Sequence, residues 1–189
     1  MQPTLEETRQ FMEQGEYRVI PFSREIPADL CTPIQVLAIL KNAGNHCFLL
    51  ESMEDSRRWG RYSFLGYGPK LLITCENGQL AVEKVLAGGE TEGKGGAGEQ
   101  RTEKGCRRSV FHTERPQEKI REILREYRAP ALPNLPSLAG GLVGYFAYDS
   151  IKYSEPSLKL DARDQEGFKD LDLMLFDKII AFDHLKQKM

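Results

Sequence analysis

The 189-residue sequence contains no long hydrophobic run, and nowhere do eighteen apolar residues follow one another. Its first residues, Met1 to Glu7, lack the basic and apolar regions of a signal peptide. We therefore expect a soluble, cytoplasmic protein with no membrane partner. The sequence also lacks a basic excess, since its net charge is -2 and 29% of its residues are charged. This balance argues against a nucleic-acid partner.

Closely spaced metal ligands and nucleophile–base pairs are also missing. No two cysteines form the close pair of a zinc or redox site, no histidine–glutamate pair has metal-ligand spacing, and no serine or cysteine has an evident base beside it. The cysteines and histidines are Cys31, Cys47, Cys75, Cys106, His46, His112 and His184. We predict that this chain contains no catalytic residue, no metal site and no cofactor. The histidines are interpreted as surface or capping residues.

Two further patterns are interpreted as structural. Aspartates recur among apolar residues towards the end of the chain, which is typical of the solvent-facing side of a strand. These residues are Asp170, Asp172, Asp177 and Asp183. Glycines at 140, 141 and 144 lack the lysine and hydroxyl residue of a phosphate loop. They indicate instead a strand that another backbone approaches closely.

The order of the predicted elements indicates an α+β fold, with antiparallel β-sheets packed against a few helices. Helices are predicted after the capping box that begins at Thr4, after Thr32 and Pro33, and after Pro116. Strands are predicted at 17–22, 47–50, 61–65, 71–75, 80–85, 140–149, 171–176 and 178–184. The segment 87–106 is rich in glycine, glutamate and lysine, so we expect a flexible insertion there. The last strand has no returning segment, which predicts a domain truncated at its C-terminus.

The apolar run Cys47–Leu50 ends on a carboxylate and a hydroxyl, those of Glu51 and Ser52. Turn residues precede this short run, which favours a buried strand rather than a helix. Arg61 begins the next predicted strand, so a carboxylate, a hydroxyl and a guanidinium would lie close together. Such groups can hold the ammonium and the carboxylate of an amino acid. The alternative is a solvated rim with a weak surface ion pair.

Three parts of the sequence carry a family resemblance. They are Phe48–Ser52 with Trp59–Gly66, Ala28–Pro33, and Gly140–Asp149 with Tyr153–Pro156. Together they resemble the N-terminal region of anthranilate synthase component I, although Cys31 stands where an acidic residue is more usual. The resemblance runs from about Tyr17 to His184. It implies an N-terminal domain at 1–189, without the C-terminal chorismate-binding catalytic domain.

The resemblance implies that the full-length protein is a lyase in tryptophan biosynthesis. It would convert chorismate, with ammonia or glutamine, to anthranilate and pyruvate, using Mg2+ and a glutamine amidotransferase subunit, component II. The implied role of this region is feedback regulation, with Leu50, Glu51 and Ser52 in half of the L-tryptophan inhibitor site. The remaining half would come from the protein's own catalytic domain. Arg61 is added to the site from its charge and position, and the fragment alone is expected to be inactive.

Two alternatives stand beside this hypothesis. Aminodeoxychorismate synthase component I has a similar N-terminal domain, although the segment Ala28–Pro33 resembles the anthranilate enzyme more. A free-standing amino-acid-binding module would have no catalytic partner.

Overall fold

A computed structural model describes residues 2–44, 46–51, 60–85, 100–101, 107–133, 135–155, 157–158 and 167–189. The chain divides into two compact units. The first comprises Met1–Pro69, Glu122–Gly141 and Phe176–Met189, and the second comprises Lys70–Arg121 and Leu142–Leu175. The pairing of the strands is antiparallel in both, so the predicted α+β fold is confirmed. Within the described parts of the chain, no helix is long and apolar enough to cross a membrane.

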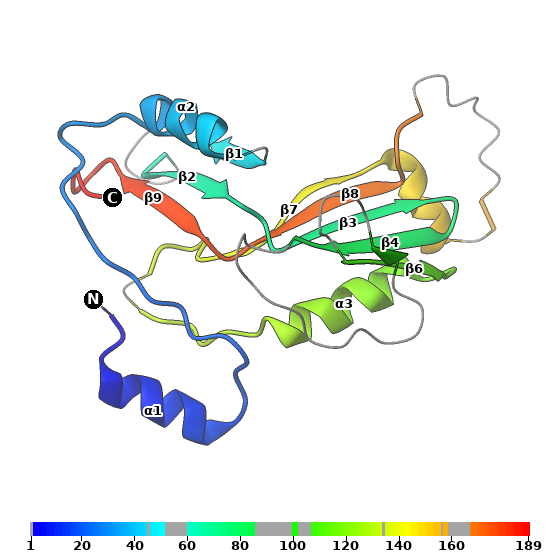
Figure 1. The fold of residues 1–189 in the computed structure, drawn as a ribbon, viewed down its shortest axis with the longest axis horizontal. Helices are drawn as coiled ribbons and strands as arrows, with labels where there is room; N and C mark the ends of the chain where they lie inside the picture. Colours follow the sequence, from blue (N-terminus) through cyan, green and yellow to red (C-terminus); the bar gives the residue numbers. More distant parts are fainter. Residues whose placement is uncertain are drawn as a thin grey trace. The chain divides into compact units, whose positions relative to one another are not determined.

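The first unit contains a three-stranded sheet in the order β1-β2-β9, with α2 packed on β1 and β2 (Figure 1). These elements are α2 (Pro33–Ala43), β1 (Cys47–Leu50), β2 (Tyr62–Tyr67) and β9 (Ile179–Asp183). Leu65 in the middle strand is fully buried and pairs with Leu49 on one side and Ile180 on the other. The central strand therefore supplies the apolar centre of this sheet.

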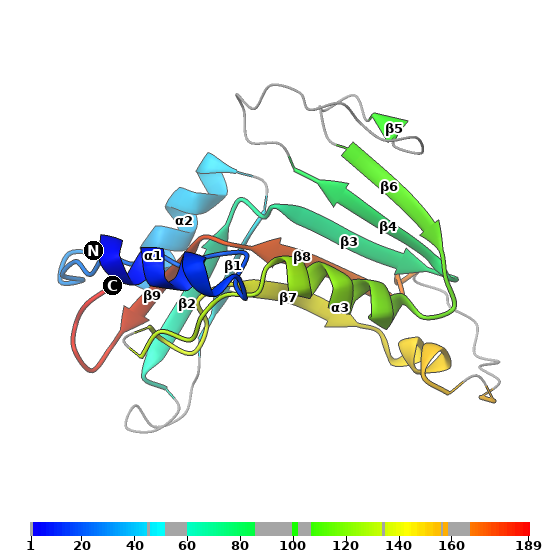
Figure 2. The same ribbon diagram turned by 90° about the horizontal axis from the view of Figure 1, so that it is seen from below.

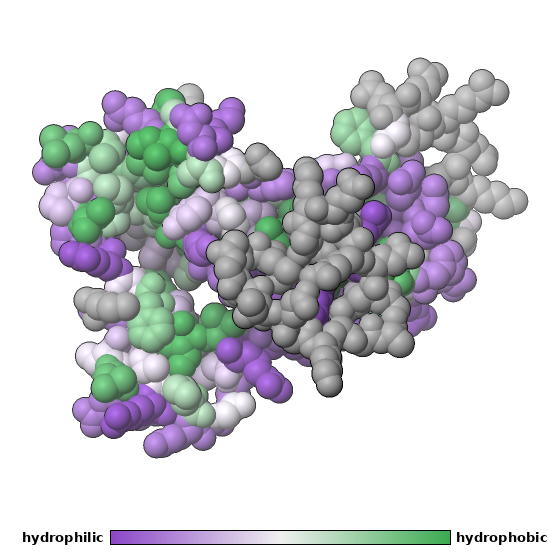
Figure 3. Space-filling model, in the orientation of Figure 1, coloured by the Kyte–Doolittle hydropathy of each residue, from purple (hydrophilic) through white to green (hydrophobic). Residues whose placement is uncertain are grey.

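The helices predicted after Thr4 and after Thr32 are both present, and each begins with a capping box, of which only the one at Thr4 was predicted. The Thr4 hydroxyl caps α1 (Leu5–Gln14) by accepting from the Glu7 N–H at 3.3 Å, and the Thr32 hydroxyl caps α2 in the same way. No residue of α2 is fully buried, and Ile34 and Ile39 are exposed. Figure 3 shows hydrophobic residues, in green, on the outer surface of this helix.

The second unit contains a six-stranded sheet in the order β5-β6-β4-β3-β8-β7 (Figure 2). Its strands are β3 (Leu71–Glu76), β4 (Gln79–Lys84), β5 (Gln100–Arg101), β6 (Arg107–His112), β7 (Gly141–Phe146) and β8 (Leu171–Phe176). Asn77 and Gly78 have positive φ and join β3 to β4 in the predicted tight hairpin. Ile73, Leu80 and Leu173 are buried in this sheet.

The close backbone approach predicted for the glycine-rich strand is confirmed at Gly144 in β7. A Cβ added there would collide with the carbonyl oxygen of Asp172 in β8, and the glycine has a φ of +158°. A 3-10 helix at Tyr148–Tyr153 follows β7. The helix predicted after Pro116 is α3 (Pro116–Glu126), whose residue Ile120 is buried.

The predicted strand at 17–22 is wrong, because this segment contains no strand. The Arg18 and Val19 N–H groups both donate to the Arg128 carbonyl, at 3.0 and 3.2 Å, so they do not form a ladder. The Tyr17 ring packs edge-on against Phe11 and lies under the Arg128 guanidinium. Aromatic and branched residues in this segment therefore serve packing rather than β-pairing.

Two other features differ from the predictions. β6 was not expected, because only Val110 and Phe111 in it are apolar, yet it pairs with β4 along its whole length. Residues 87–99 and 102–106 of the expected insertion lie outside the described residues, while Gln100–Arg101 pairs with β6. The chain after β9 turns back, so that Lys188 pairs with Asp183 and Met189 exchanges two hydrogen bonds with Ile26.

Candidate functional site

The predicted site begins at the C-terminal end of β1. The strand itself is confirmed, but it is an edge strand of the three-stranded sheet and is not fully buried as predicted. Leu50 is 47% exposed and Glu51 is also exposed. Because Leu50 pairs with Phe64 and Glu51 contacts Ser63, the two side chains point to opposite faces of the sheet. Ser52, the next predicted site residue, lies outside the described residues.

Glu51 lies beside Ser63 of β2. Leu50 pairs with Phe64, so continuing the register by one residue places Glu51 opposite Ser63. The Ser63 hydroxyl donates to Glu51 Oε1 at 3.3 Å. Ser63 is only 3% exposed, and its Oγ also lies 2.7 Å from Nε2 of His184, just after β9. Three adjacent strands thus bring a carboxylate, a hydroxyl and an imidazole together.

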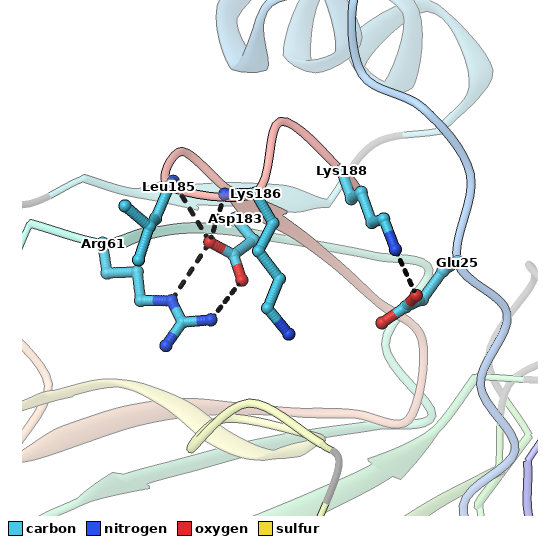
Figure 4. Close-up of polar contacts among 6 residues, drawn as sticks. All are labelled: Glu25, Arg61, Asp183, Leu185, Lys186 and Lys188. Atoms are coloured by element: carbon cyan, nitrogen blue, oxygen red, sulfur yellow. Dashed lines mark hydrogen bonds and ion pairs between the residues drawn. The ribbon is translucent and has the colours of Figure 1, made fainter.

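Arg61 is held by the carboxylate of Asp183, the last residue of β9 (Figure 4). Its Nε donates to Oδ1 at 3.1 Å and its Nη2 to Oδ2 at 2.6 Å, a two-pronged ion pair. Asp183 Oδ1 also accepts the N–H groups of Leu185 and Lys186, both at 3.1 Å. The Arg61 hydrogen bonds, with smaller contributions from the two N–H groups, outweigh burial and lower the pKa of Asp183.

The prediction that Asp183 and Asp170 face solvent is wrong, since they are 9% and 6% exposed. Alternation with apolar residues correctly indicated strands, but it could not show that each carboxylate is buried with a cation. The cation is Arg61 for Asp183 and Lys152 for Asp170. Charge pairing makes burial of such a carboxylate possible.

Asp170 is the centre of a buried polar network in the second unit. It accepts hydrogen bonds from Lys152 Nζ at 2.6 Å, the Tyr153 hydroxyl at 2.5 Å and the Asn77 N–H at 2.8 Å. Burial alone would raise the pKa of Asp170, but these hydrogen bonds together outweigh it and lower the pKa. The Tyr153 oxygen accepts the Gly78 N–H at 2.7 Å, so the network fixes the β3–β4 turn.

Cys75 and Tyr153, which lie in or beside this network, both have a raised pKa because of their burial. Cys75 lies 3.5 Å from the Tyr153 hydroxyl, and burial raises the pKa of its thiol. Burial, reinforced by the bond to Asp170, likewise raises the pKa of Tyr153 far above its ordinary value. A neutral thiol and a neutral phenol held in this way are poor nucleophiles at neutral pH. The network therefore stabilises the fold and has no evident chemistry.

Among the residues that the structure describes, no group of three or more His, Cys, Asp or Glu side chains could hold a metal ion.

The predicted site residues of the first unit differ in how their charges are balanced. Glu51 offers a carboxylate for an ammonium group and Leu50 an apolar surface, while the charge of Arg61 is largely balanced by Asp183. Sequence reasoning missed Ser63, His184 and Asp183. Ser63 had a signal, since alternation places it on the same face of β2 as the buried Leu65. No sequence pattern indicated the contacts of His184 and Asp183 with the residues of β2 and its start, because both lie far from β2 in the sequence.

The chain is similar to several curated proteins, although no protein-family model matches it. It is 33% identical over 188 residues to anthranilate synthase component 1 of Acetivibrio thermocellus, which covers 99% of this chain and 33% of that protein. Anthranilate synthase component 1 of Aquifex aeolicus is 34% identical over 186 residues, 98% of this chain and 33% of the relative. The chain thus spans about a third of the length of these relatives.

The chain is also similar to proteins of known structure. The crystal structure of anthranilate synthase component I from Streptococcus pneumoniae TIGR4 is 24% identical in sequence and has a TM-score of 0.47. The match covers 88% of this chain and 30% of that one.

Proposed function

Because the chain is homologous to about the N-terminal third of anthranilate synthase component 1, we propose that it is the feedback-regulatory part of such an enzyme. In this proposal the longer protein works in the cytoplasm and converts chorismate, with ammonia or glutamine, to anthranilate and pyruvate. Its C-terminal catalytic domain, Mg2+ and a glutamine amidotransferase subunit, component II, supply the chemistry. The 189-residue chain alone is inactive and contributes half of an L-tryptophan site.

The observation that carries the ligand site is the position of Glu51. Its carboxylate is exposed at the end of β1, one residue after the exposed apolar side chain of Leu50. An ammonium group needs such an acceptor, and an indole ring needs an apolar wall. Ser52 follows directly in the sequence and is the third member of the proposed site.

Arg61 has a secondary place in the proposed site. Its guanidinium makes a two-pronged ion pair with Asp183, so it is fixed in position and much of its charge is balanced. We propose that it orients the carboxylate of the ligand through its remaining N–H groups. Its contribution to affinity is therefore smaller than that of Glu51.

The alternatives differ in ligand and in partner. Both curated relatives named above are anthranilate synthases, which favours L-tryptophan over the ligands of the aminodeoxychorismate branch. A free-standing amino-acid-binding module would bind its ligand tightly without another domain. Weak binding that is selective for L-tryptophan supports the regulatory domain over both alternatives.

Calorimetric titration of L-tryptophan into the 189-residue chain tests the proposal. We expect weak binding, with a Kd of roughly 1 mM, because half of the site is missing. Ser52→Phe should abolish this binding and Glu51→Gln should weaken it, whereas Glu76→Gln, at an exposed carboxylate in the second unit, should leave it unchanged.

Two results would contradict the proposal. One is tight binding whose affinity is unchanged in Ser52→Phe and Glu51→Gln. The other is that no saturable binding is detected even at L-tryptophan concentrations well above the expected Kd. Anthranilate fluorescence, measured with chorismate and ammonia, is expected to stay at background for this chain. Formation of anthranilate would show that the catalytic machinery lies here.

A further inference from the structure

The Glu51 carboxylate, the Ser63 hydroxyl and the His184 imidazole lie in a row across one face of the β1-β2-β9 sheet. Ser63 pairs with Phe182, and His184 lies two residues beyond Phe182 on the same face. The His184 N–H donates to the Arg61 carbonyl at 2.9 Å, which continues the β2–β9 ladder. This bond holds the main chain of His184 against β2, and the imidazole lies beside Ser63.

The Ser63 hydroxyl can donate in only one direction. It has a single proton and two lone pairs, and it contacts both Glu51 Oε1 at 3.3 Å and His184 Nε2 at 2.7 Å. An ionised carboxylate only accepts hydrogen bonds, so the serine proton must point to Glu51. Ser63 must then accept from His184, and this requires a proton on Nε2 of the imidazole.

The opposite arrangement is less favourable. If Ser63 donated to an unprotonated Nε2, the lone pairs of its buried oxygen would face the Glu51 carboxylate with no proton between them. Ser63 is only 3% exposed, so water is largely excluded from its hydroxyl. An unmatched pair of acceptors at such a position is disfavoured.

We propose that Ser63 and His184 are positioning residues for Glu51, linked in the order His184 Nε2–H to Ser63 Oγ to Glu51 Oε1. The short bond at 2.7 Å fixes the hydroxyl, and the longer bond at 3.3 Å orients the carboxylate while leaving its other oxygen for a ligand. The consequence for binding rests on the proposed L-tryptophan site. The direction of the two hydrogen bonds does not.

The direction is tested by NMR on the 15N-labelled 189-residue chain. At about pH 8, above the ordinary imidazole pKa near 6.5, long-range 1H–15N correlations distinguish the two neutral tautomers. We expect His184 in the form protonated at Nε2, with its signals assigned by their loss in His184→Gln. Ser63→Ala should shift these signals and leave those of His46 and His112 in place. A predominant Nδ1-protonated tautomer would overturn the proposal.

The effect on the ligand is tested by titrating L-tryptophan into matched variants. Ser63→Ala and His184→Leu should each weaken binding about fivefold, because Glu51 loses its orienting partner. Ser63→Thr and His184→Gln keep the donors and should restore most of the affinity, and His112→Leu, on β6 of the other unit, serves as the control.

The two experiments separate failure of this inference from failure of the proposed function. Unchanged affinity in both Ser63→Ala and His184→Leu, with binding by the unaltered chain, would overturn the positioning role alone. If the unaltered chain does not bind L-tryptophan, the proposed function fails, and the tautomer of His184 still decides the direction of the hydrogen bonds.

Discussion

Asp183 receives two hydrogen bonds from Arg61, and both residues lie at the end of the β2–β9 pair where the proposed ligand site begins. The same carboxylate accepts two backbone N–H groups of the turn that follows β9. One side chain therefore joins the start of β2 to the turn that returns the chain towards Ile26. The ion pair consequently stabilises this end of the β2–β9 pair.

Replacing Asp183 with Asn should destabilise the protein by about 1–3 kcal/mol, because it removes the charge that four donors share. Arg61 is left without its partner, but its side chain is 33% exposed and can be hydrated, which limits the loss. Urea denaturation measures the free energy of unfolding. Asp29→Asn, at an exposed aspartate, is the control and should change it little. Equal stability of the Asp183→Asn variant and the unaltered chain would contradict this account.

Stability should fall in acid through Asp183 and Asp170. Both have a pKa that is lowered in the folded protein, Asp183 mainly by Arg61 and Asp170 by hydrogen bonds that outweigh its burial. Their contribution is therefore complete above the unfolded pKa of about 4, and it is lost as the pH falls through the lower folded values. Urea denaturation from neutral pH to about pH 2 should show this decline. In Asp170→Asn the free energy of unfolding should fall less steeply with falling pH than in the unaltered chain. A decline that is equally steep or steeper in this variant would contradict the role of Asp170.

The elements with a local signal were predictable from the sequence. The capping box at Thr4, the helix start at Thr32 and Pro33, and the Asn77-Gly78 hairpin depend on neighbouring residues and are present as predicted. β6 had no such signal, because most of its residues are exposed and its order comes from pairing with β4. Local chemistry is visible in a sequence, whereas pairing between distant segments is not.

The candidate site was only partly predictable for the same reason. The apolar run that ends at Leu50 and Glu51 is a local pattern, and the structure has a strand there. Asp183, the partner of Arg61, lies 122 residues away in the sequence, and His184, one of the two partners of Ser63, lies 121 residues away. Such contacts follow from the order β1-β2-β9, which no short pattern in the sequence contains.

Removing the Tyr153 hydroxyl with Tyr153→Phe should destabilise the chain by about 1–3 kcal/mol. The change takes one donor from the buried Asp170 and leaves the Gly78 N–H without its 2.7 Å acceptor. Tyr148→Phe is a matched control, because Tyr148 is 84% exposed. The two variants are compared by chemical denaturation. A loss in Tyr153→Phe no larger than that in Tyr148→Phe would mean that the network contributes nothing to stability.

Adding a methyl group with Gly144→Ala should destabilise the sheet by about 2 kcal/mol or more. The new Cβ would collide with the Asp172 carbonyl of the neighbouring strand, and the φ of +158° is one that alanine rarely adopts. Gly44→Ala provides the control, since Gly44 has an extended backbone and nothing lies within 4 Å of an added Cβ. The shift in the midpoint of thermal unfolding measures the difference. The Asp172 carbonyl is a backbone group and cannot move aside as a flexible side chain can. Equal midpoints for the two variants would therefore mean that β7 and β8 do not approach each other closely at Gly144.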